Sequence, residues 1–328
     1  MGVYLVTGGA GFIGSNLIAT LLRQGHVVHA LDLHEAPPEL LHPKLTWFQG
    51  DLLDSTIVNS SVQGVDAVVH LAAQTSVPIS VEHPERTLEV NVRGTEILIE
   101  QCQHHGVRRL LSASSAAVYG DCRNLPLTEE KAGMLLSPYA ESKWANEKQL
   151  LEAKNEGIDA MALRFFNVYG NHVAKGKVVG GVISAFIRAM ITESPLQIHG
   201  NGEQTRDFVH VSDVADAIVS LLTMEPKYTE HAVNVCHGTQ TSLLNLIGMI
   251  EQELMKQNRL TGPVSPFFSE PLPGDIQHSL GSPSLLQSLI EWHPKYTLQE
   301  GIEKIITSLE EMPCLLYTSD AADEGFCV

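Results

Sequence analysis

The glycine-rich stretch at residues 7–14, TGGAGFIG, most constrains the fold of this 328-residue chain. It follows a short apolar run typical of a buried strand and opens a run with helical periodicity. Gly8 permits a tight turn, Gly11 lets the backbone approach phosphate groups, and Gly14 allows close packing of helix on strand. The N–H groups at the start of such a helix attract an anion. This order of strand, glycine loop and helix predicts a dinucleotide-binding site.

Asp32 strengthens this interpretation. It ends the second apolar run, residues 27–31, at the distance from the glycine loop that is expected of a ribose-binding acid. A carboxylate there accepts hydrogen bonds from both ribose hydroxyls and would repel a 2′-phosphate. A glycine-rich turn without a ligand is the alternative, because glycine patterns alone give false positives. Asp32 favours the binding site, with NAD rather than NADP as the cofactor.

Charge and composition exclude several classes of partner. The formal net charge is -17, so we expect neither nucleic acid nor an anionic membrane surface as a partner. No apolar run approaches the length of a membrane span, and Met1 leads almost directly into the first strand, which leaves no room for a signal peptide. Five cysteines show no disulfide or metal spacing, which favours the cytoplasm. We expect no metal site, and we expect His70 and His210 to be hydrogen-bonded structural residues.

Strands and helices alternate through the first half of the chain. Short connections between them predict an α/β fold of the Rossmann type, with a doubly wound parallel sheet. After the first two strands, further strands are predicted at residues 45–48, 67–71, 109–115 and 160–165, and helices at 88–101 and 142–156.

The pattern changes after Gly170. A polar loop at 172–181 is followed by predicted helices at 182–190, 213–224 and 296–312 and by a short strand at 196–199. We therefore predict a cofactor-binding domain over residues 1–170, with residues 207–236 packing back on it. A smaller C-terminal α/β region, made of residues 171–206 and 237–312, would bind the substrate.

Residues 314–328 do not fit this organisation. Pro313 breaks the last helix, and the residues after it show no amphipathic period. The sequence CLLYTSDAADE resembles a conceptual translation of a sequencing adapter, so we interpret this tail as non-native and exclude it from the fold. The alternative is a genuine acidic, disordered tail.

The stretch Tyr139-Ala-Glu-Ser-Lys143 carries the clearest catalytic signal. A phenol and an ammonium four residues apart share one face of a helix, and the lysine charge would lower the pKa of the tyrosine. Ser115 closes a predicted strand at the carboxyl edge of the sheet, where its hydroxyl could orient a substrate hydroxyl. The Tyr–Lys spacing alone is common by chance. Together with the glycine loop and Ser115, it predicts a catalytic trio.

With these motifs, the chain resembles the extended short-chain dehydrogenase/reductase proteins, specifically the NAD-dependent nucleotide-sugar epimerase/dehydratase group. The resemblance covers residues 1 to about 312. It is carried by TGGAGFIG (7–14), Asp32, GDLLD (50–54), HLAAQ (70–74), NVRGT (91–95), SSAAVYG (114–120), YAESK (139–143), LRFFNVYG (163–170), RDFVHVSD (206–213) and PGDIQHS (273–279).

The resemblance implies roles for the matching residues. Beside the glycines, Asp32, Tyr139 and Lys143, the implied NAD-binding residues are Phe12, Ile13, Asp51 and Leu52 (adenine), Leu71, Ala72 and Ala73 (lining), Asn91 (support of the lysine) and Phe166 (nicotinamide). The expected nucleotide-sugar contacts are Ser115, Asn167 and Arg206 (the last two on the diphosphate), Val182, His199, Asp275 and Ser279. A homodimer through the helices at 88–101 and 142–156 is also implied.

The two residues after Ser115 bear on the reaction. Related dehydratases and decarboxylases carry carboxylates there, whereas this chain has Ala116 and Ala117, which favours 4-epimerisation of a UDP-hexose. In the implied reaction, Tyr139 takes the proton of the sugar 4-hydroxyl while C4 gives a hydride to NAD, and the rotated 4-keto sugar is reduced on its other face. The alternatives are a dehydratase, decarboxylase or reductase of the same group, and a non-catalytic NAD-binding sensor.

The C-terminal motif departs from the epimerase pattern. Leu272 replaces an arginine that usually contacts the pyrophosphate, and Gln277 stands where related sequences often have arginine. Anion binding would then depend on Arg206, with Lys175 or Lys177 as possible substitutes. Ser279 falls beside the implied 2-substituent of the sugar, and its small side chain predicts room for an N-acetyl group. The alternative is that Ser279 merely packs in a loop.

Overall fold

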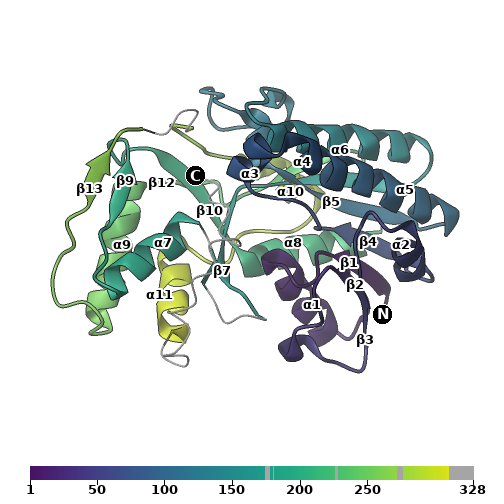
Figure 1. Cartoon of the computed structure of the whole chain (residues 1–328), viewed down its shortest axis with the longest axis horizontal. Helices are drawn as coiled ribbons and strands as arrows, with labels where there is room; N and C mark the ends of the chain where they lie inside the picture. Colours follow the sequence, from purple (N-terminus) through teal and green to yellow (C-terminus); the bar gives the residue numbers. More distant parts are fainter. Residues whose placement is uncertain (174–177, 180, 226–227, 272–275, 310–328) are drawn as a thin grey trace.

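Seven parallel strands form the central sheet of the computed structural model, which describes residues 1–173, 178–179, 181–225, 228–271 and 276–309 (Figure 1). Their order is β11-β6-β5-β4-β1-β2-β3. The strands are β1 (Val3–Thr7), β2 (Val27–Asp32), β3 (Leu45–Gln49), β4 (Ala67–His70), β5 (Arg109–Ser115), β6 (Asp159–Phe165) and β11 (Ala232–Val235). The predicted Rossmann-type fold is confirmed. The seventh strand, β11, is absent from the prediction; it pairs with β6 in parallel.

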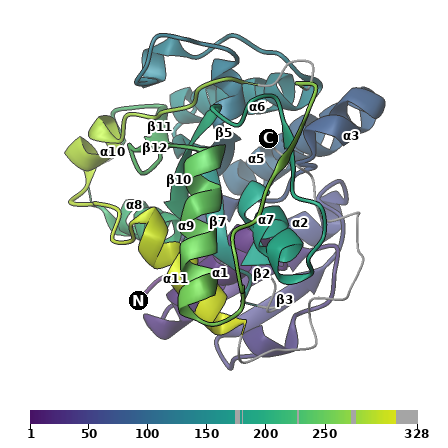
Figure 2. The same cartoon turned by 90° about the vertical axis from the view of Figure 1, so that its left-hand side faces the viewer.

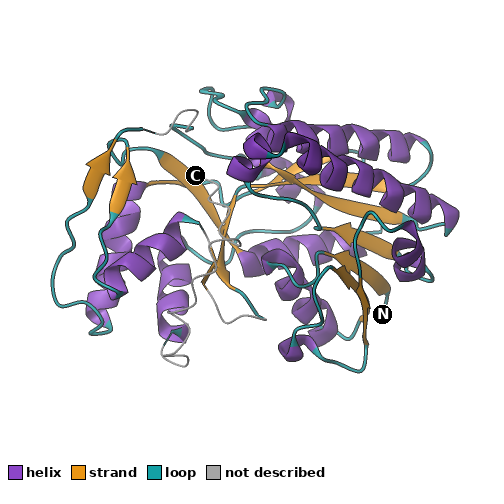
Figure 3. Cartoon of the chain, viewed as in Figure 1, coloured by secondary structure: helices purple, strands orange, loops and turns teal. Residues whose placement is uncertain are grey.

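Helices cover both faces of this sheet (Figures 1 and 3). One face carries α1 (Phe12–Arg23) and α8 (Val211–Thr223), and the other carries α2 (Ser55–Val62), α5 (Gly94–His104) and α6 (Pro138–Asn155). Successive strand residues point to opposite faces, so Val6 packs with the α1 and α8 side chains while Leu5 packs with those of α2 and α5. Burial on both faces explains why these strands read as continuous apolar runs.

The helix expected at residues 88–101 is made of three pieces. After α3 (Val77–Glu82), α4 (Pro84–Leu88) continues through a π-helical turn (Glu89–Arg93) into α5. Asn91 lies in this turn and is fully buried. Single π-helical turns inside α-helices often mark functional sites.

The second half of the chain builds a smaller body beside the sheet (Figure 2). Its four-stranded sheet has the order β12-β10-β7-β8, and β13 pairs with β9 in a separate two-stranded sheet. These strands are β7 (Asn167–Asn171), β8 (Val178–Val179), β9 (Gln197–His199), β10 (Thr205–His210), β12 (Gln240–Ser242) and β13 (Phe267–Ser269). Its helices are α7 (Val182–Ile191), α9 (Leu243–Lys256) and α11 (Leu298–Ser308), whereas α10 (Ser284–Leu289) packs on the large sheet beside β11. Ile183, Leu246 and Ile302 share a buried core that is separate from the cores of the large sheet.

Several boundaries in this half differ from the prediction. The helix α8 begins at Val211, because the His210 side chain accepts the Ser212 N–H and starts the helix there. The helix α11 begins after Thr297, which forms a capping box with Glu300. The strands β7, β10, β12 and β13 and the helix α9 are absent from the prediction. The predicted tail at 314–328 lies outside the described residues.

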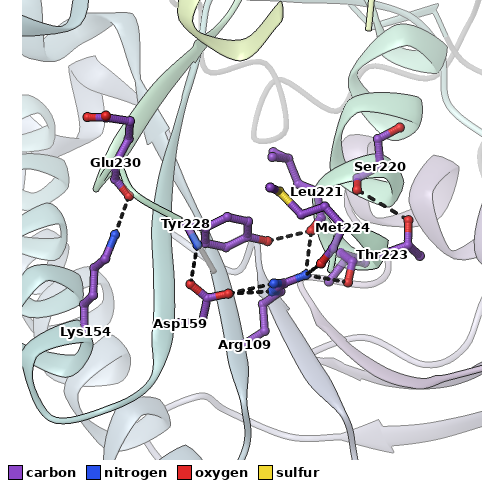
Figure 4. A network of polar contacts seen from close by, with 10 residues as sticks. Arg109, Lys154, Asp159, Ser220, Leu221, Thr223, Met224, Tyr228 and Glu230 are labelled. Atoms are coloured by element: carbon purple, nitrogen blue, oxygen red, sulfur yellow. Dashed lines mark hydrogen bonds and ion pairs between the residues drawn. The ribbon is translucent and has the colours of Figure 1, made fainter. Parts of the chain in front are cut away.

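Arg109 joins the last crossover to the sheet (Figure 4). Its guanidinium forms an ion pair with Asp159 at 2.7 Å and donates to the carbonyls of Leu221 and Met224 at the end of α8. Tyr228 adds a hydroxyl bond to the Leu221 carbonyl and lies beneath the guanidinium, 4.5 Å from ring centroid to Cζ. These bonds satisfy carbonyls that a helix end leaves unpaired. They fix the path that leads from α8 into β11.

No helix in the described part of the chain combines the length and the apolar character needed to cross a membrane.

Candidate functional site

The strand order reverses between β1 and β4, and this reversal places the site. From β1, the chain builds outward to β2 and β3 on one side and to β4, β5, β6 and β11 on the other. In open α/β sheets, ligands bind in the crevice at the carboxyl ends of the strands flanking such a reversal. The glycine loop follows β1 at this edge.

The glycine loop has the shape of a phosphate cradle. Gly8 has a φ of +71°, and a Cβ there would lie 2.8 Å from the Ala72 nitrogen. A Cβ at Gly14 would lie 2.1 Å from the Gly8 carbonyl oxygen, so only glycine lets α1 approach the loop this closely. Gly11 is the N-cap of α1 and offers no side chain to the first N–H groups of the helix, which is what a phosphate-binding helix start requires. The loop therefore fits a dinucleotide pyrophosphate.

The other predicted NAD-binding residues follow the ends of neighbouring strands. Asp32 ends β2, and its carboxylate accepts the N–H of Ala10 at 3.0 Å and that of His34 at 3.0 Å. Asp51 and Leu52 follow β3, and Leu71, Ala72 and Ala73 follow β4. Thr7 accepts the N–H groups of both Leu71 and Ala72, which ties that lining segment to β1. All of these residues lie along the one carboxyl edge.

Replacing Asp32 by the neutral isostere Asn is expected to narrow the preference for NAD over NADP by about tenfold, or about 1.4 kcal/mol, because the charge that repels a 2′-phosphate is lost. Dissociation constants for both cofactors, measured by calorimetry on the two proteins, test this. Asp54→Asn, a change in the cap of α2, is the control. Tighter binding of NADP than NAD by the unaltered protein would refute the assignment.

His70 is a structural residue, as predicted. Its ring nitrogens bond to the Thr7 hydroxyl at 2.7 Å and to the Thr95 hydroxyl at 3.0 Å. Burial lowers the pKa of His70 to about 3, so the ring is neutral at physiological pH.

Asn91 does not bond to Lys143 through its side chain; it donates to Ser142 at 2.9 Å and to the Gln74 carbonyl. It therefore acts on the catalytic helix one residue away from the lysine.

Tyr139 and Lys143 lie on consecutive turns of α6. This helix begins at Pro138, four residues before the predicted start, because Ser137 caps it by accepting the Ala140 N–H and proline suits the first helical position. Lys143 donates to the carbonyl of Ala113 in β5 at 2.9 Å, and its Nζ lies 5.8 Å from the Tyr139 ring centroid. Burial lowers the pKa of Lys143 to about 8, so the ammonium is still charged at pH 7.

Ser115 lies two residues beyond the carbonyl that Lys143 contacts. It ends β5 opposite Phe165 of β6, and its Oγ accepts the Ala117 N–H at 3.1 Å. Phe166 comes directly after Phe165 in the chain and packs against Tyr119, with the ring centroids 6.1 Å apart. The structure thus brings the predicted trio and Phe166 to the same end of β5 and β6. This arrangement can hold a substrate hydroxyl next to a phenol whose proton is exchangeable.

Two of the predicted substrate residues are buried along β10 of the smaller body. The Arg206 guanidinium donates to the carbonyls of Thr205 and Ile276 at 3.0 and 2.7 Å. Ser279 is also buried, and its N–H donates to the Thr205 carbonyl at 3.1 Å. These bonds hold the segment 276–279 along the edge of β10, so Arg206 and Ser279 belong to one connected unit.

The remaining predicted substrate contacts are described only in part. Asn167 begins β7 directly after Phe166, and Val182 begins α7. Asp275 lies outside the described residues, as do Leu272, Lys175 and Lys177. The substrate contact expected of Asp275, the anion binding expected of Lys175 or Lys177 and the effect of Leu272 on the diphosphate site stay predictions.

His199 lines a cleft of about 550 Å³ at the far end of this body. Sequence reasoning missed most of its other lining residues, among them Gln204 and Phe268, because β9 and β13 are short and lie about 70 residues apart in the chain. Phe268 is half exposed, and Gln277 also faces the cleft. An aromatic ring beside polar side chains suits a flat, polar ligand group.

Asp207 is a further residue whose role sequence reasoning missed, although it lies in the quoted motif RDFVHVSD. Its buried carboxylate accepts the N–H groups of His237, Gly238 and Gly281 at 2.8, 3.0 and 3.1 Å. Burial raises the pKa of Asp207 to about 6, and the three N–H bonds oppose that shift. Asp207 therefore holds separate chain segments together behind Ser279.

A Rossmann-type sheet with a Ser, Tyr and Lys constellation at its carboxyl edge defines a short-chain dehydrogenase/reductase of the extended type. A sequence model of the NAD dependent epimerase/dehydratase family matches residues 4–236. The chain belongs to this family, and its cofactor is NAD.

Relatives and solved structures agree with this assignment. The chain is 34% identical over 312 residues to a UDP-glucose 4-epimerase of Mycolicibacterium smegmatis, which covers 92% of this chain and 96% of the relative. It superposes with a TM-score of 0.85 and 30% identity on a UDP-N-acetylglucosamine 4-epimerase from Methanobrevibacter ruminantium in complex with UDP-N-acetylmuramic acid, over 94% of this chain and 98% of that one. The UDP-glucose 4-epimerase of Thermus thermophilus in complex with NAD gives a TM-score of 0.82 and 32% identity, over 94% and 99% of the two chains.

Proposed function

We propose that this protein is an NAD-dependent UDP-sugar 4-epimerase. The observation that carries the proposal is which side chains lie at the end of β5. Tyr139 and Lys143 lie beside this strand end, and the 3-10 turn that follows it contains Ala116 and Ala117. Removal of water across C5 and C6 of a sugar needs an additional acid and base, and this turn supplies none. The similarity to UDP-sugar 4-epimerases supports the same reaction.

In this proposal, the residues of the chain divide the work between binding and proton transfer. The glycine loop and Asp32 hold NAD, which when bound takes a hydride from C4 of the sugar and returns it to the other face. Tyr139 takes the proton of the sugar 4-hydroxyl and gives it back. Lys143, fixed by the Ala113 carbonyl, stabilises the phenolate, and Ser115 orients the sugar hydroxyl.

The substrate contacts are proposed from the same positions. Arg206 and Asn167 bind the diphosphate, since a guanidinium held in place by two carbonyls has the planar donor geometry that suits phosphate oxygens. The cleft at His199 takes the nucleotide base. The division of the chain into a cofactor-binding domain (1–170, with 207–236) and a nucleotide-sugar-binding region (171–206 and 237–312) belongs to this proposal.

Incubation of the purified protein with UDP-glucose, UDP-galactose and their N-acetylated counterparts tests the reaction. Interconverted 4-epimers support the proposal. A 4-keto-6-deoxy or pentose product would make the protein a dehydratase or decarboxylase instead. Bound NAD without turnover on any of these sugars would favour a non-catalytic sensor.

Ser279 is expected to set which sugars are accepted. Replacing it by Tyr should lower kcat/KM for the N-acetylated UDP-sugars by on the order of 10²-fold, because overfilling a packed site costs about 1–3 kcal/mol, and should largely spare the plain hexoses. Steady-state assays on both substrate classes measure the difference. The matched control is Ser284→Tyr at the exposed start of α10. Equal losses on both classes, or no N-acetyl activity in the unaltered protein, would remove Ser279 from this role.

We further propose a homodimer formed through α4, α5 and α6. Leu88 of α4 and Leu151 of α6 are exposed by 39% and 42%, and these two helices pack side by side on one face of the sheet. Leucines at this exposure would be buried by a second copy of the same surface. Sedimentation of Leu151→Glu, expected to be monomeric, tests the interface.

We place the protein in the cytoplasm, since the described cysteines Cys102, Cys122 and Cys236 are free thiols.

A further inference from the structure

We propose that His172 is a positioning residue that holds the glycine-rich loop in its NAD-binding shape. His172 follows β7 and therefore comes from the part of the chain that leads into the smaller body. It is buried, with 5% of its surface exposed, although it lies in a polar loop segment. Its ring contacts residues of the glycine loop and of α1, at the opposite end of the sequence.

The two ring nitrogens of His172 contact the glycine loop and the first turn of α1. Nε2 lies 3.1 Å from the carbonyl oxygen of Ala10, and Nδ1 lies 3.4 Å from the Ser15 hydroxyl. A carbonyl oxygen can only accept, so Nε2 carries the proton and donates it. The ring also packs at an angle against Phe12, with the centroids 6.3 Å apart. His172 thus contacts the chain just before, at and just after the start of α1.

Ala10 is consequently held from two sides. Its N–H donates to the Asp32 carboxylate, and its carbonyl accepts from His172. The next N–H, that of Gly11, donates to the Gly8 carbonyl at 3.0 Å. The peptide plane between Ala10 and Gly11 is therefore fixed at both ends. Because this plane leads into Gly11, the N-cap of α1, its orientation helps to set where the first N–H groups of the helix point.

His172 is itself anchored on both halves of the molecule. The preceding residue, Asn171, accepts from the Asn16 side chain of α1 at 3.0 Å through its carbonyl. Its side chain donates to Ser308 at the end of α11, at 2.8 Å. The segment 171–172 therefore bridges α1 and α11. A change in the smaller body can reach the NAD site along this bridge without passing through the catalytic trio.

The test compares two variants that differ in one donor. His172→Phe keeps a ring and loses both nitrogens, whereas His172→Gln keeps an N–H that can reach the Ala10 carbonyl. Binding of NADH to protein freed of cofactor, followed by its fluorescence, should give a dissociation constant raised about tenfold in the Phe variant and less than about threefold in the Gln variant, in line with the loss of one buried hydrogen bond. The matched control is His210→Phe, since His210 is equally buried and caps α8 without contacting the glycine loop.

Unchanged NADH binding in His172→Phe would overturn the proposal, and so would equal weakening in the Phe and Gln variants or in the His210 control. If the Phe variant fails to fold, Asn16→Ala releases the bridge while leaving His172 in place; a raised dissociation constant supports the proposal, and an unchanged one rejects it. The inference rests on NAD binding and not on the sugar reaction. Its failure would therefore leave the proposed epimerase activity standing, and absence of epimerase activity would leave this measurement valid.

Discussion

Replacing Tyr139 by Phe is expected to lower kcat for UDP-sugar 4-epimerisation by about 10²–10⁴-fold, the usual contribution of a general acid–base group. Only the phenolic oxygen is lost, and the ring that packs at the start of α6 remains. The Tyr139 backbone N–H still donates to Ser80, so the first turn of the helix keeps its partner. We therefore expect NAD binding and melting temperature to stay close to those of the unaltered protein.

The control for this variant is Tyr228→Phe. Tyr228 also has a buried hydroxyl that donates a hydrogen bond, but it lies at the opposite end of β6 from Ser115 and Phe166, next to Asp159. Its loss should affect stability and leave kcat unchanged. A Tyr139→Phe protein that retains most of its turnover would reject the phenol as the proton-transfer group.

Replacing Arg164 by Met is expected to lower the free energy of unfolding by about 3–5 kcal/mol, because it leaves the Glu147 carboxylate buried without its partner. The guanidinium and the carboxylate lie 2.7 Å apart, and both side chains are at most 3% exposed. Burial acts to lower the pKa of Arg164, but the bonds to Glu147 outweigh it and the net pKa is raised. Chemical denaturation of the two proteins measures the loss.

Two further variants show whether the loss comes from the unpaired charge. The double variant Glu147→Leu with Arg164→Met removes both charges and should recover a large part of the stability. Arg123→Met breaks an exposed pair with Asp121 and should change the unfolding free energy by about 0–1 kcal/mol. A single variant as stable as the unaltered protein would show that the buried pair contributes nothing.

The buried pair also matters for the site. Glu147 lies one turn after Lys143 on α6, and it accepts the Ser114 hydroxyl at 2.5 Å as well as the guanidinium of Arg164. Arg164 in turn donates to the Tyr119 hydroxyl. The helix that carries the catalytic residues is thereby bonded to the ends of β5 and β6, next to Ser115 and Phe166.

Much of the large sheet could be predicted from local pattern. Six strands appear as apolar runs because both faces of the sheet are covered. The glycine loop marks the turn between the first strand and the first helix. The strand β11 was missed because its four residues, AVNV, are too short and include the polar Asn234. The buried Asn234 side chain has hydrogen-bond partners in Tyr119 and Leu127, which are more than 100 residues away in the chain.

The catalytic residues could also be predicted from a local pattern, but the residues that hold them in place could not. Tyr139 and Lys143 are one helical turn apart, so spacing alone brings them together. The pairing of Arg164 with Glu147, of Asp207 with Gly281 and of His172 with Ala10 depends on how distant segments fold onto one another. No local period records such contacts. The smaller body was the least predictable part because its strands are short and pair across long separations.

The position of β11 has a consequence for how the chain is made. The large sheet receives its last strand from residues 232–235, after β7, β9 and β10 of the smaller body have already been synthesised. Until then, β6 ends the sheet with unpaired backbone groups, and exposed edges of this kind promote association with other chains. A growing polypeptide leaves the ribosome from its N-terminus. The sheet therefore stays incomplete, with six strands, until the segment between β6 and β11 has been synthesised. Arg109, whose side chain binds the end of α8, holds the segment that leads into β11 and so completes the sheet.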